Sequence, residues 1–396
     1  MNAQQKGIIT LIKSAIDGQA YPLPEAFDID QAVKEALKHK IIALIYYGAI
    51  NCGIDRKCDA MTKLFQYTAR TLAIVKKQQM EIDRVIKAFE ANGIEYLPMK
   101  GVVLQKSYYK AEMRSMGDVD VLIRMEQYET IQQIMMSLGF AFQYESDHEL
   151  VWSHNHIMIE LHKRVMTSYN ADFYKYFGDG WKFAKKISAD KTGYRLSDED
   201  FYVYMFVHFT KHYRVSGIGI KHLVDLWVFL RDKPDMDKDY IRGELVKINL
   251  LDFHENVMDT IRLWFADGEL TEKTDYISQV IFSSGEYGSE NNSELSRILR
   301  ESVKLGSRKA AKWHDFWNRV CPPYAEMCKA YCVVRKVPVL LPVFWGIRWG
   351  EIFLLKRKRL HRFFDNNIYS EKRINNRKKA LELVGLDFYA EDQIQG

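Results

Sequence analysis

The stretch Met116-Gly-Asp-Val-Asp-Val-Leu-Ile123 decides the fold of this 396-residue chain. Apolar and polar residues alternate in it, so a β-strand would turn its two valines and Ile123 toward a face that can be buried. The opposite face would carry Asp118, Asp120 and Leu122. Two carboxylates about 6–7 Å apart on one strand repel each other unless a cation lies between them or one is protonated. The pair therefore indicates a site for a hard divalent metal ion such as magnesium, and the alternative is a solvated strand edge.

A second stretch, His156-Ile-Met-Ile-Glu-Leu-His162, alternates in the same way. The strand that it predicts would turn Glu160 and His162 toward a polar face. Three carboxylates on two neighbouring strands can hold two metal ions about 3.5–4 Å apart, the arrangement used in phosphoryl and nucleotidyl transfer. We interpret Asp118, Asp120 and Glu160 as such a triad. The alternative is that Glu160 and His162 form an exposed strand face.

A strand-to-helix turn is predicted upstream of both strands. Residues 94–99 form a short apolar strand, Lys100 and Gly101 follow, and a helical pattern begins at Val102. A glycine at such a turn lets backbone N–H groups approach a phosphate, and the N-terminus of the helix attracts the anion. Lys100 would add a positive charge. The alternative is an ordinary turn glycine.

Together these segments resemble the uncharacterised branch of the DNA-polymerase-β-like nucleotidyltransferase superfamily. That branch typically shows Leu-Lys-Gly, an Arg shortly before Gly-Asp-x-Asp, here Arg114, and a late strand with an acidic residue followed by Leu-His. The resemblance covers residues 94–165, and a weaker one includes residues 206–226. Two features depart from the wider superfamily: Val102 stands where Ser or Gly is usual, which removes a hydroxyl contact to phosphate, and sixteen residues separate Gly101 from Asp118.

The resemblance implies an α+β fold, with a small mixed-sheet nucleotidyltransferase core between a helical N-terminal region and a large helical C-terminal region. It implies transfer of a nucleoside monophosphate from an NTP, such as ATP, to a hydroxyl-type acceptor with release of pyrophosphate. Asp118, Asp120 and Glu160 would be catalytic and would hold two Mg²⁺ ions, with Mn²⁺ as an alternative. Lys100, Gly101 or Arg114 would contact the phosphates. The acceptor stays open between a sugar, a small metabolite, a protein and RNA.

A second polar cluster is predicted on two helices. His208 and His212 are four residues apart and share one helix face, but the segment lacks the Glu of a zinc-protease helix. In the functional interpretation the two helices line the nucleotide cleft, Lys221 contacts a phosphate, and Asp225 orients a histidine or a base edge. The alternative is a polar stripe packed against the next helix.

Three other functions fit parts of the sequence. A metal-dependent glycosyltransferase also uses Asp-x-Asp, although the mostly helical residues 1–92 differ from the α/β unit that usually precedes that motif. A non-catalytic nucleotide-binding scaffold would have no need of three carboxylates. A toxin-like transferase that modifies a partner protein is the third alternative.

The pattern divides the chain into four predicted regions. These are a helical N-terminal region at 1–92, the nucleotidyltransferase core at 93–166, a helical domain closing the cleft at 167–334, and a basic-aromatic helical segment at 335–396. Within them, an N-cap at Asp28 predicts a helix to about Tyr47, and residues 291–293 predict a loop.

The net charge of +5 is unevenly distributed, because residues 335–379 hold 13 Lys and Arg against three Asp and Glu. The apolar residues 337–355 precede a basic run, but prolines and two charged residues interrupt them, which argues against a membrane span. Residues 337–362 could instead contact an anionic membrane at its inner face, bind nucleic acid, or form a buried helix with a basic end. Five scattered cysteines and a start without a signal peptide predict a reduced, cytoplasmic protein.

Overall fold

A computed structural model describes residues 1–168, 170–285, 288, 290–355 and 370–388 of the chain. The described residues form two compact units. Unit 1 contains residues 1–213 and 217–288, and unit 2 contains residues 214–216 and the described residues from 290 onward. Each unit is described by itself. The four regions predicted from the sequence stay predictions.

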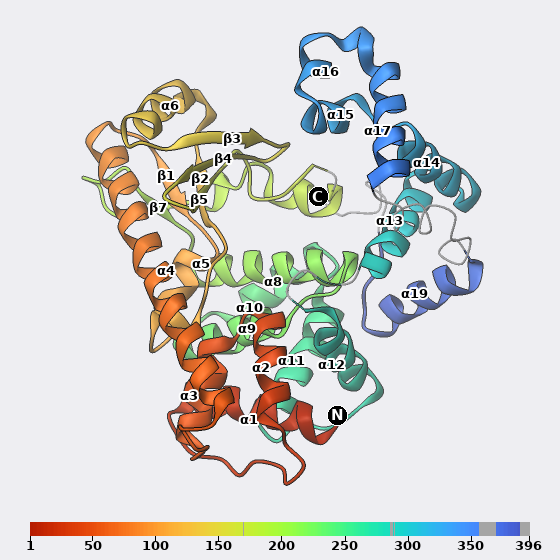
Figure 1. The fold of residues 1–396 in the computed structure, drawn as a ribbon. Helices are drawn as coiled ribbons and strands as arrows, with labels where there is room; N and C mark the ends of the chain where they lie inside the picture. Colours follow the sequence, from red (N-terminus) through yellow and green to blue (C-terminus); the bar gives the residue numbers. More distant parts are fainter. Residues whose placement is uncertain (169, 286–287, 289, 356–369, 389–396) are drawn as a thin grey trace. The chain divides into compact units, whose positions relative to one another are not determined.

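Unit 1 combines helices with a small sheet, so the predicted α+β class is confirmed (Figure 1). Its α-helices are α1 (Ala3–Asp17), α2 (Ile29–His39), α3 (Ile42–Asn51), α4 (Asp59–Ala91), α5 (Gly101–Leu104), α6 (Tyr128–Ser137), α7 (Ala171–Phe177), α8 (Asp198–Val215), α9 (Ile220–Asp232), α10 (Lys238–Lys247), α11 (Leu251–Phe265) and α12 (Glu272–Ser284). Short 3₁₀ turns are η1 (Gln105–Ser107), η2 (Ala111–Met113), η3 (Met125–Gln127) and η4 (Trp181–Phe183).

The main sheet has five strands in the order β1-β2-β5-β4-β3. The strands are β1 (Tyr96–Pro98), β2 (Val119–Ile123), β3 (Ala141–Glu145), β4 (Glu149–His154) and β5 (Ile157–His162). Only the central pair β2–β5 is parallel, and the other neighbours in this sheet are antiparallel. A separate two-stranded ribbon joins β6 (Lys185–Lys186) to β7 (Tyr194–Arg195). The two acidic segments found in the sequence are therefore neighbours at the centre of the sheet.

One face of the sheet is apolar and is covered by α4 and α6 (Figure 1). The alternating apolar residues of β2 and β5 pack there against Ile82, Val85 and Phe89 of α4 and Ile131 of α6. Burying these side chains fixes the register of the strands, because a slip by one residue would turn the carboxylates into the core. The same alternation sends the polar side chains of β2 and β5 to the opposite face, as predicted.

The helix predicted from Asp28 to Tyr47 is wrong in one respect, because the structure divides it into α2 and α3. The Asp28 side chain does accept backbone N–H groups at the start of α2. The break falls at Lys40, whose φ of 55° places it in the left-handed region that ends many helices. The backbone N–H of Lys40 bonds to the carbonyl of Ala36 and closes the last turn.

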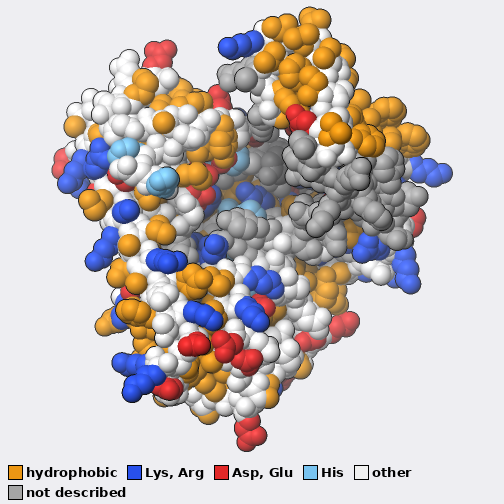
Figure 2. All heavy atoms as spheres, in the orientation of Figure 1, with side chains coloured by type: hydrophobic (Ala, Val, Ile, Leu, Met, Phe, Trp, Pro, Cys, Tyr) orange, Lys and Arg blue, Asp and Glu red, His pale blue; other side chains and the backbone are white. Residues whose placement is uncertain are grey.

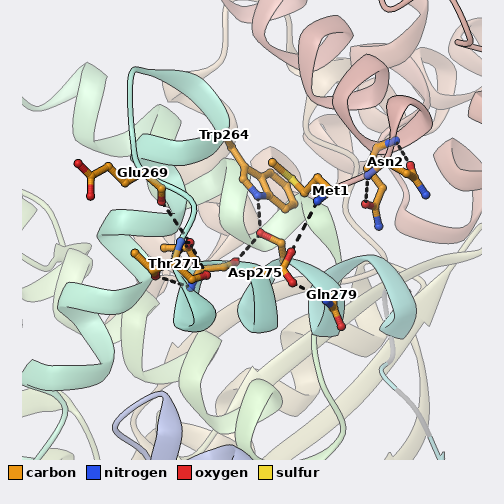
Figure 3. A network of polar contacts seen from close by, with 10 residues as sticks. Met1, Asn2, Trp264, Glu269, Thr271, Asp275 and Gln279 are labelled. Carbon is orange, nitrogen blue, oxygen red and sulfur yellow. Dashed lines mark hydrogen bonds and ion pairs between the residues drawn. The ribbon is translucent and has the colours of Figure 1, made fainter.

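A network of polar contacts joins the N-terminus to α12 within unit 1 (Figure 3). The terminal amino group of Met1 lies 3.6 Å from a carboxylate oxygen of Asp275. Thr271 caps α12 through a capping box with Thr274, and the indole of Trp264 donates to Ser278. These contacts hold α1, α11 and α12 together around the lower part of the unit.

The regular elements of unit 2 in its described residues are all helices. It contains α13 (Glu290–Lys304), α14 (Arg308–Val320), α15 (Tyr324–Ala330), α16 (Cys332–Lys336), the 3₁₀ turn η5 (Pro338–Leu340), α17 (Leu341–Leu355) and α19 (Glu371–Leu383). Buried Asp315 pairs with Arg297 and Arg319 and connects α13 to α14. The loop predicted at residues 291–293 is wrong, because these residues lie in the first turn of α13, where polar residues are well tolerated.

The exposed side of α17 is apolar and includes Val343, Ile347 and Leu354. Figure 2 shows hydrophobic side chains gathered on this part of unit 2, around α15 to α17. Arg348 instead donates to a backbone carbonyl, and Glu351 accepts a hydrogen bond from a tyrosine. In the described part of the chain, no helix combines the length and the apolar character needed to cross a membrane. The basic run 356–362 of the predicted membrane contact lies outside the described residues.

Candidate active site

A cavity of about 450 Å³ in unit 1 lies beside the polar face of the sheet. The strands and their connections contribute an acidic side and helices α8 and α9 contribute a basic side. Polar residues that line the cavity are Lys100, Arg114, Asp118, Asp120, His148, Glu149, Tyr204, His208, Lys211, His212, Lys221, His222 and Asp225. Nine of the ten residues predicted as site residues line this cavity, Gly101 included, and Glu160 lies next to it on β5.

The acidic side is built by the pairing of β2 with β5. Asp120 and Glu160 are directly opposite each other in this parallel pair. His162, two residues further along β5, approaches both carboxylates, with Nε2 at 2.7 Å from Asp120 Oδ1 and 3.5 Å from Glu160 Oε2. Asp120 and His162 are almost fully buried. Two strands distant in the sequence thus bring two carboxylates and an imidazole into contact.

Asp118, just before β2, adds a third carboxylate. Burial, with the negative charges of Asp120 and Glu160, raises the pKa of Asp118 to about 7. A side-chain interaction with Glu160 also raises the pKa of Asp118. Repulsion of this kind is what a bound cation relieves.

Lys100 forms an ion pair with Asp120, at 2.5 Å between Nζ and Oδ1. Burial alone would raise the pKa of Asp120, but the Lys100 charge and the hydrogen bond from His162 outweigh it and hold that pKa far below its usual value. In turn, burial disfavours the charged amine of Lys100, and the Asp120 charge more than compensates and raises the pKa of Lys100. Lys100, predicted as a phosphate contact, therefore touches the carboxylate cluster in this structure.

The turn at Lys100 and Gly101 differs from the expected strand-to-helix turn. Lys100, not the glycine, has the positive φ of 46°, and α5 extends over only four residues, too short for a helix N-terminus to act on a phosphate through its dipole. A Cβ at Gly101 would lie 2.6 Å from Cγ and Sδ of Met116, so a larger residue would displace that flexible side chain. The glycine therefore permits close contact of α5 with the segment that carries Asp118.

Arg114 and Asp225 form a buried ion pair. The Arg114 Nε donates to both carboxylate oxygens of Asp225, at 2.8 and 3.0 Å, and the Tyr108 hydroxyl donates to Asp225 at 2.8 Å. Both charged side chains are less than 10% exposed. Arg114, predicted as a phosphate contact, thus pairs with Asp225 of α9 in this structure, and the pair connects the segment before β2 to α9.

The basic side of the cavity is formed by α8 and α9. His208 and His212 are in hydrogen-bond contact, at 3.3 Å between their Nε2 atoms, and the ring of His222 lies near both. Burial, followed by the charge of Lys211, lowers the pKa of His212 to about 3, and burial lowers the pKa of His208 and of His222 as well. These histidines are therefore neutral at pH 7, and the positive charge comes from the lysines and Arg114.

Five polar residues of the cavity were missed by the sequence interpretation: His148, Glu149, Tyr204, Lys211 and His222. Two of them carry a usable signal, because Lys211 is three residues after His208 and His222 is three residues before Asp225, spacings that share a helix face. Burial, and then the charge of Lys100, lowers the pKa of Lys211 to about 8. His148 and Glu149 could be assigned to the cavity only from the register of β4 in the sheet, which no local sequence pattern supplies.

The acidic side has the donor set of a divalent metal site. Ligand atoms of Asp120, Glu160 and His162 lie within 4.8 Å of one another, and Asp118 adjoins them through Glu160. Carboxylate oxygens suit Mg²⁺ and Mn²⁺, and burial together with the charges of Asp120 and Glu160 raises the pKa of Asp118 beside them. The residues present therefore fit a hard divalent cation.

Residues 25–266 match the family described as uncharacterised nucleotidyltransferase, which is more than half of the chain. The chain belongs to this family. The matched residues contain the whole five-stranded sheet together with α8 and α9, so every residue predicted for the site lies inside them. Membership in the nucleotidyltransferase family supports nucleotide transfer as the general activity of the protein.

Two solved structures are similar to part of the chain. One is the crystal structure of ANT(2″)-Ia in complex with adenylyl-2″-tobramycin, at 10% identity and a TM-score of 0.32, over 43% of this chain and 97% of that one. The other is the solution structure of the antibiotic-resistance factor ANT(2″)-Ia, at 11% identity and a TM-score of 0.31, over 43% of this chain and 89% of that one. No curated protein matches the chain.

Proposed function

We propose that this protein transfers a nucleoside monophosphate from an NTP to a hydroxyl-bearing acceptor and releases pyrophosphate. The oxygen of the acceptor hydroxyl forms a bond to the α-phosphorus while the bond from that phosphorus to the bridging oxygen breaks. The acceptor loses one proton, and the electron pair of the broken bond leaves with pyrophosphate. ATP is the first donor to test.

Asp118, Asp120 and Glu160 would hold the Mg²⁺ ions, and Mn²⁺ is the alternative. Bound there, such ions would neutralise phosphate charge and favour ionisation of the acceptor hydroxyl. His162 donates to Asp120 and keeps that carboxylate aimed at the cavity. With the charge of Asp120 neutralised in such a site, the amine of Lys100 would be available to contact the phosphates.

The basic side would receive the triphosphate. Lys211 and Lys221 line it, and Lys211 forms no ion pair with any other described residue. The Arg114–Asp225 pair would set the distance between the basic and acidic sides, because it joins the segment before β2 to α9. The three neutral histidines of this side could contact the base and the ribose, and they add no charge.

The observation that supports this proposal most directly is the pairing of Asp120 with Glu160 on the acidic side of a cavity whose basic side contains two lysines. It favours phosphoryl chemistry over a binding scaffold, because a scaffold needs the basic side but not a cluster of repelling carboxylates. Family membership favours nucleotidyl transfer over glycosyl transfer.

The test combines binding and turnover. The full chain is titrated with a non-hydrolysable ATP analogue with and without Mg²⁺, and then incubated with α-labelled NTPs and panels of sugars, small metabolites, proteins and RNA. We expect Mg²⁺-dependent binding and label transfer, both lost in the variant Asp118→Asn/Asp120→Asn. The variant Asp239→Asn/Asp252→Asn, which changes two exposed aspartates of α10 and α11, is the matched control. Undiminished Mg²⁺-dependent binding and transfer by the first variant would refute the proposal.

A further inference from the structure

His162 makes a hydrogen bond through only one of its two ring nitrogens. Its Nε2 contacts Asp120 at 2.7 Å, whereas its Nδ1 is buried and has no hydrogen-bond partner among the described residues. The side chain is 2% exposed, so water gives no ready compensation. A buried polar atom without a partner costs about 1–3 kcal/mol, which calls for a ligand at that position.

The contact with Asp120 defines what Nδ1 can bind. An ionised carboxylate only accepts hydrogen bonds, so the neutral imidazole must carry its proton on Nε2 and a lone pair on Nδ1. A histidine held by a carboxylate in this way is the usual arrangement of a metal-binding histidine, in which the carboxylate fixes the tautomer and the ring orientation.

Two further ligands lie beside His162 on the neighbouring strand. Glu149 of β4 is directly opposite His162 of β5, and the ring of His148 meets the ring of His162 edge-on, with centroids 5.6 Å apart. Ligand atoms of His148, Glu149 and His162 lie within 4.8 Å of one another. His148 Nδ1 is 3.3 Å from the hydroxyl of Ser146, which can accept a hydrogen bond from a protonated Nδ1. Nε2, which is 3.1 Å from Glu149, is then left as a ligand atom.

We propose that His148, Glu149 and His162 bind a divalent transition metal ion of the Zn²⁺ and Co²⁺ class. Two imidazoles and one carboxylate match the ligand preference of such ions, whereas Mg²⁺ prefers oxygen ligands alone. The site adjoins the Asp118, Asp120 and Glu160 cluster but does not use those three carboxylates as ligands, because Asp120 acts in it only through its hydrogen bond to His162. It needs no nucleotide, so it goes beyond the proposed function.

The test measures Zn²⁺ retention without nucleotide. The full chain, stripped of metal with a chelator, is dialysed against Zn²⁺ in the presence of a large excess of Mg²⁺. We expect one retained Zn²⁺ per chain in the wild type and its loss in His148→Asn and in Glu149→Gln. His156→Asn, which removes an exposed histidine from the β4–β5 turn and keeps a residue that tolerates its positive φ of 65°, should retain the ion. Equal retention by the two ligand variants, or none by the wild type, overturns the proposal.

A measurement on the wild type alone covers the case in which a ligand variant does not fold. Co²⁺ replaces Zn²⁺, and proton NMR is recorded in H₂O and in D₂O. Two imidazole N–H protons near the paramagnetic ion should appear as strongly shifted resonances that vanish in D₂O, one for each histidine ligand. Strongly shifted resonances without two exchangeable ones would mean that Co²⁺ is bound by carboxylates elsewhere, and the site would be rejected.

Discussion

Asp120 of β2 and Glu160 of β5 are directly paired across the parallel strands at the centre of the sheet. Neighbouring strands lie about 4.8 Å apart, so the two carboxylates share one small volume although they come from distant parts of the sequence. Lys100 and His162 both contact Asp120 there, and Asp118 adjoins Glu160. This pairing joins the two acidic segments into one candidate metal site.

Glu160→Gln should lower Mg²⁺ affinity and nucleotide transfer by at least about 10–100-fold, the range found when even an outer partner of a metal site is removed. The amide keeps the shape of the side chain and removes its charge. Mg²⁺ titration and initial transfer rates provide the measurement. Glu126→Gln, an exposed glutamate just after β2, is the control, and equal rates in the two variants would exclude Glu160 from the site.

Asp118→Asn should stabilise the metal-free protein at alkaline pH. The folded-state pKa of Asp118, about 7, is above its ordinary value of 3.8 because of burial and of the charges of Asp120 and Glu160. Below pH 3.8 both states hold the proton. Between pH 3.8 and 7 only the unfolded state releases it, so stability falls as pH rises, and above pH 7 the loss is complete.

The expected gain from Asp118→Asn is on the order of 2–4 kcal/mol at pH 8, with little gain at pH 4. Urea unfolding with a chelator present, compared at the two pH values, measures it. Mg²⁺ should stabilise the wild type more than this variant. A gain that is the same at both pH values would show that Asp118 does not titrate between them.

Asp225→Ala should destabilise unit 1 by about 3–5 kcal/mol, because it leaves the Arg114 guanidinium buried without its carboxylate. Tyr108→Phe removes one hydrogen bond to Asp225 and should cost only about 1 kcal/mol. The double variant Arg114→Met/Asp225→Leu should recover much of the stability. Thermal unfolding tests the series, and a double variant less stable than both single variants would contradict an isolated pair.

Lys211→Ala should weaken NTP binding about 10–100-fold at pH 7, the equivalent of one hydrogen bond to a charged group. The Lys211 amine, with its pKa lowered to about 8 by burial and by Lys100, is charged below pH 8 and loses that charge above it. Wild-type affinity for NTP should therefore fall between pH 7 and 9.

Lys211→Arg should remove this pH dependence, because arginine stays protonated throughout that range. Fluorescent NTP titrations at several pH values measure both effects, and Lys63→Ala, an exposed lysine of α4, controls for the loss of one charge. A fall in affinity that persists in Lys211→Arg would assign the titration to another group.

Local patterns predicted most of the core of unit 1. Period-two alternation in residues 116–123 and 156–162 was sufficient for the strands and for their polar and apolar faces, because only one register buries the apolar set. The break at Lys40 escaped prediction, because a lysine rather than a glycine adopts the left-handed conformation there. The close approach of Gly101 to Met116 also escaped prediction, because local sequence does not reveal that contact.

By itself the sequence determined the acidic strands, the amphipathic helices and the family to which they belong, because these follow from local periodicity and short motifs. Only the tertiary structure decided which charges meet. It pairs Lys100 with Asp120 and Arg114 with Asp225, and it brings Glu149 opposite His162. The reason is physical: strand register and helix packing are fixed by burial of apolar side chains across the whole unit, and the polar contacts follow from that burial.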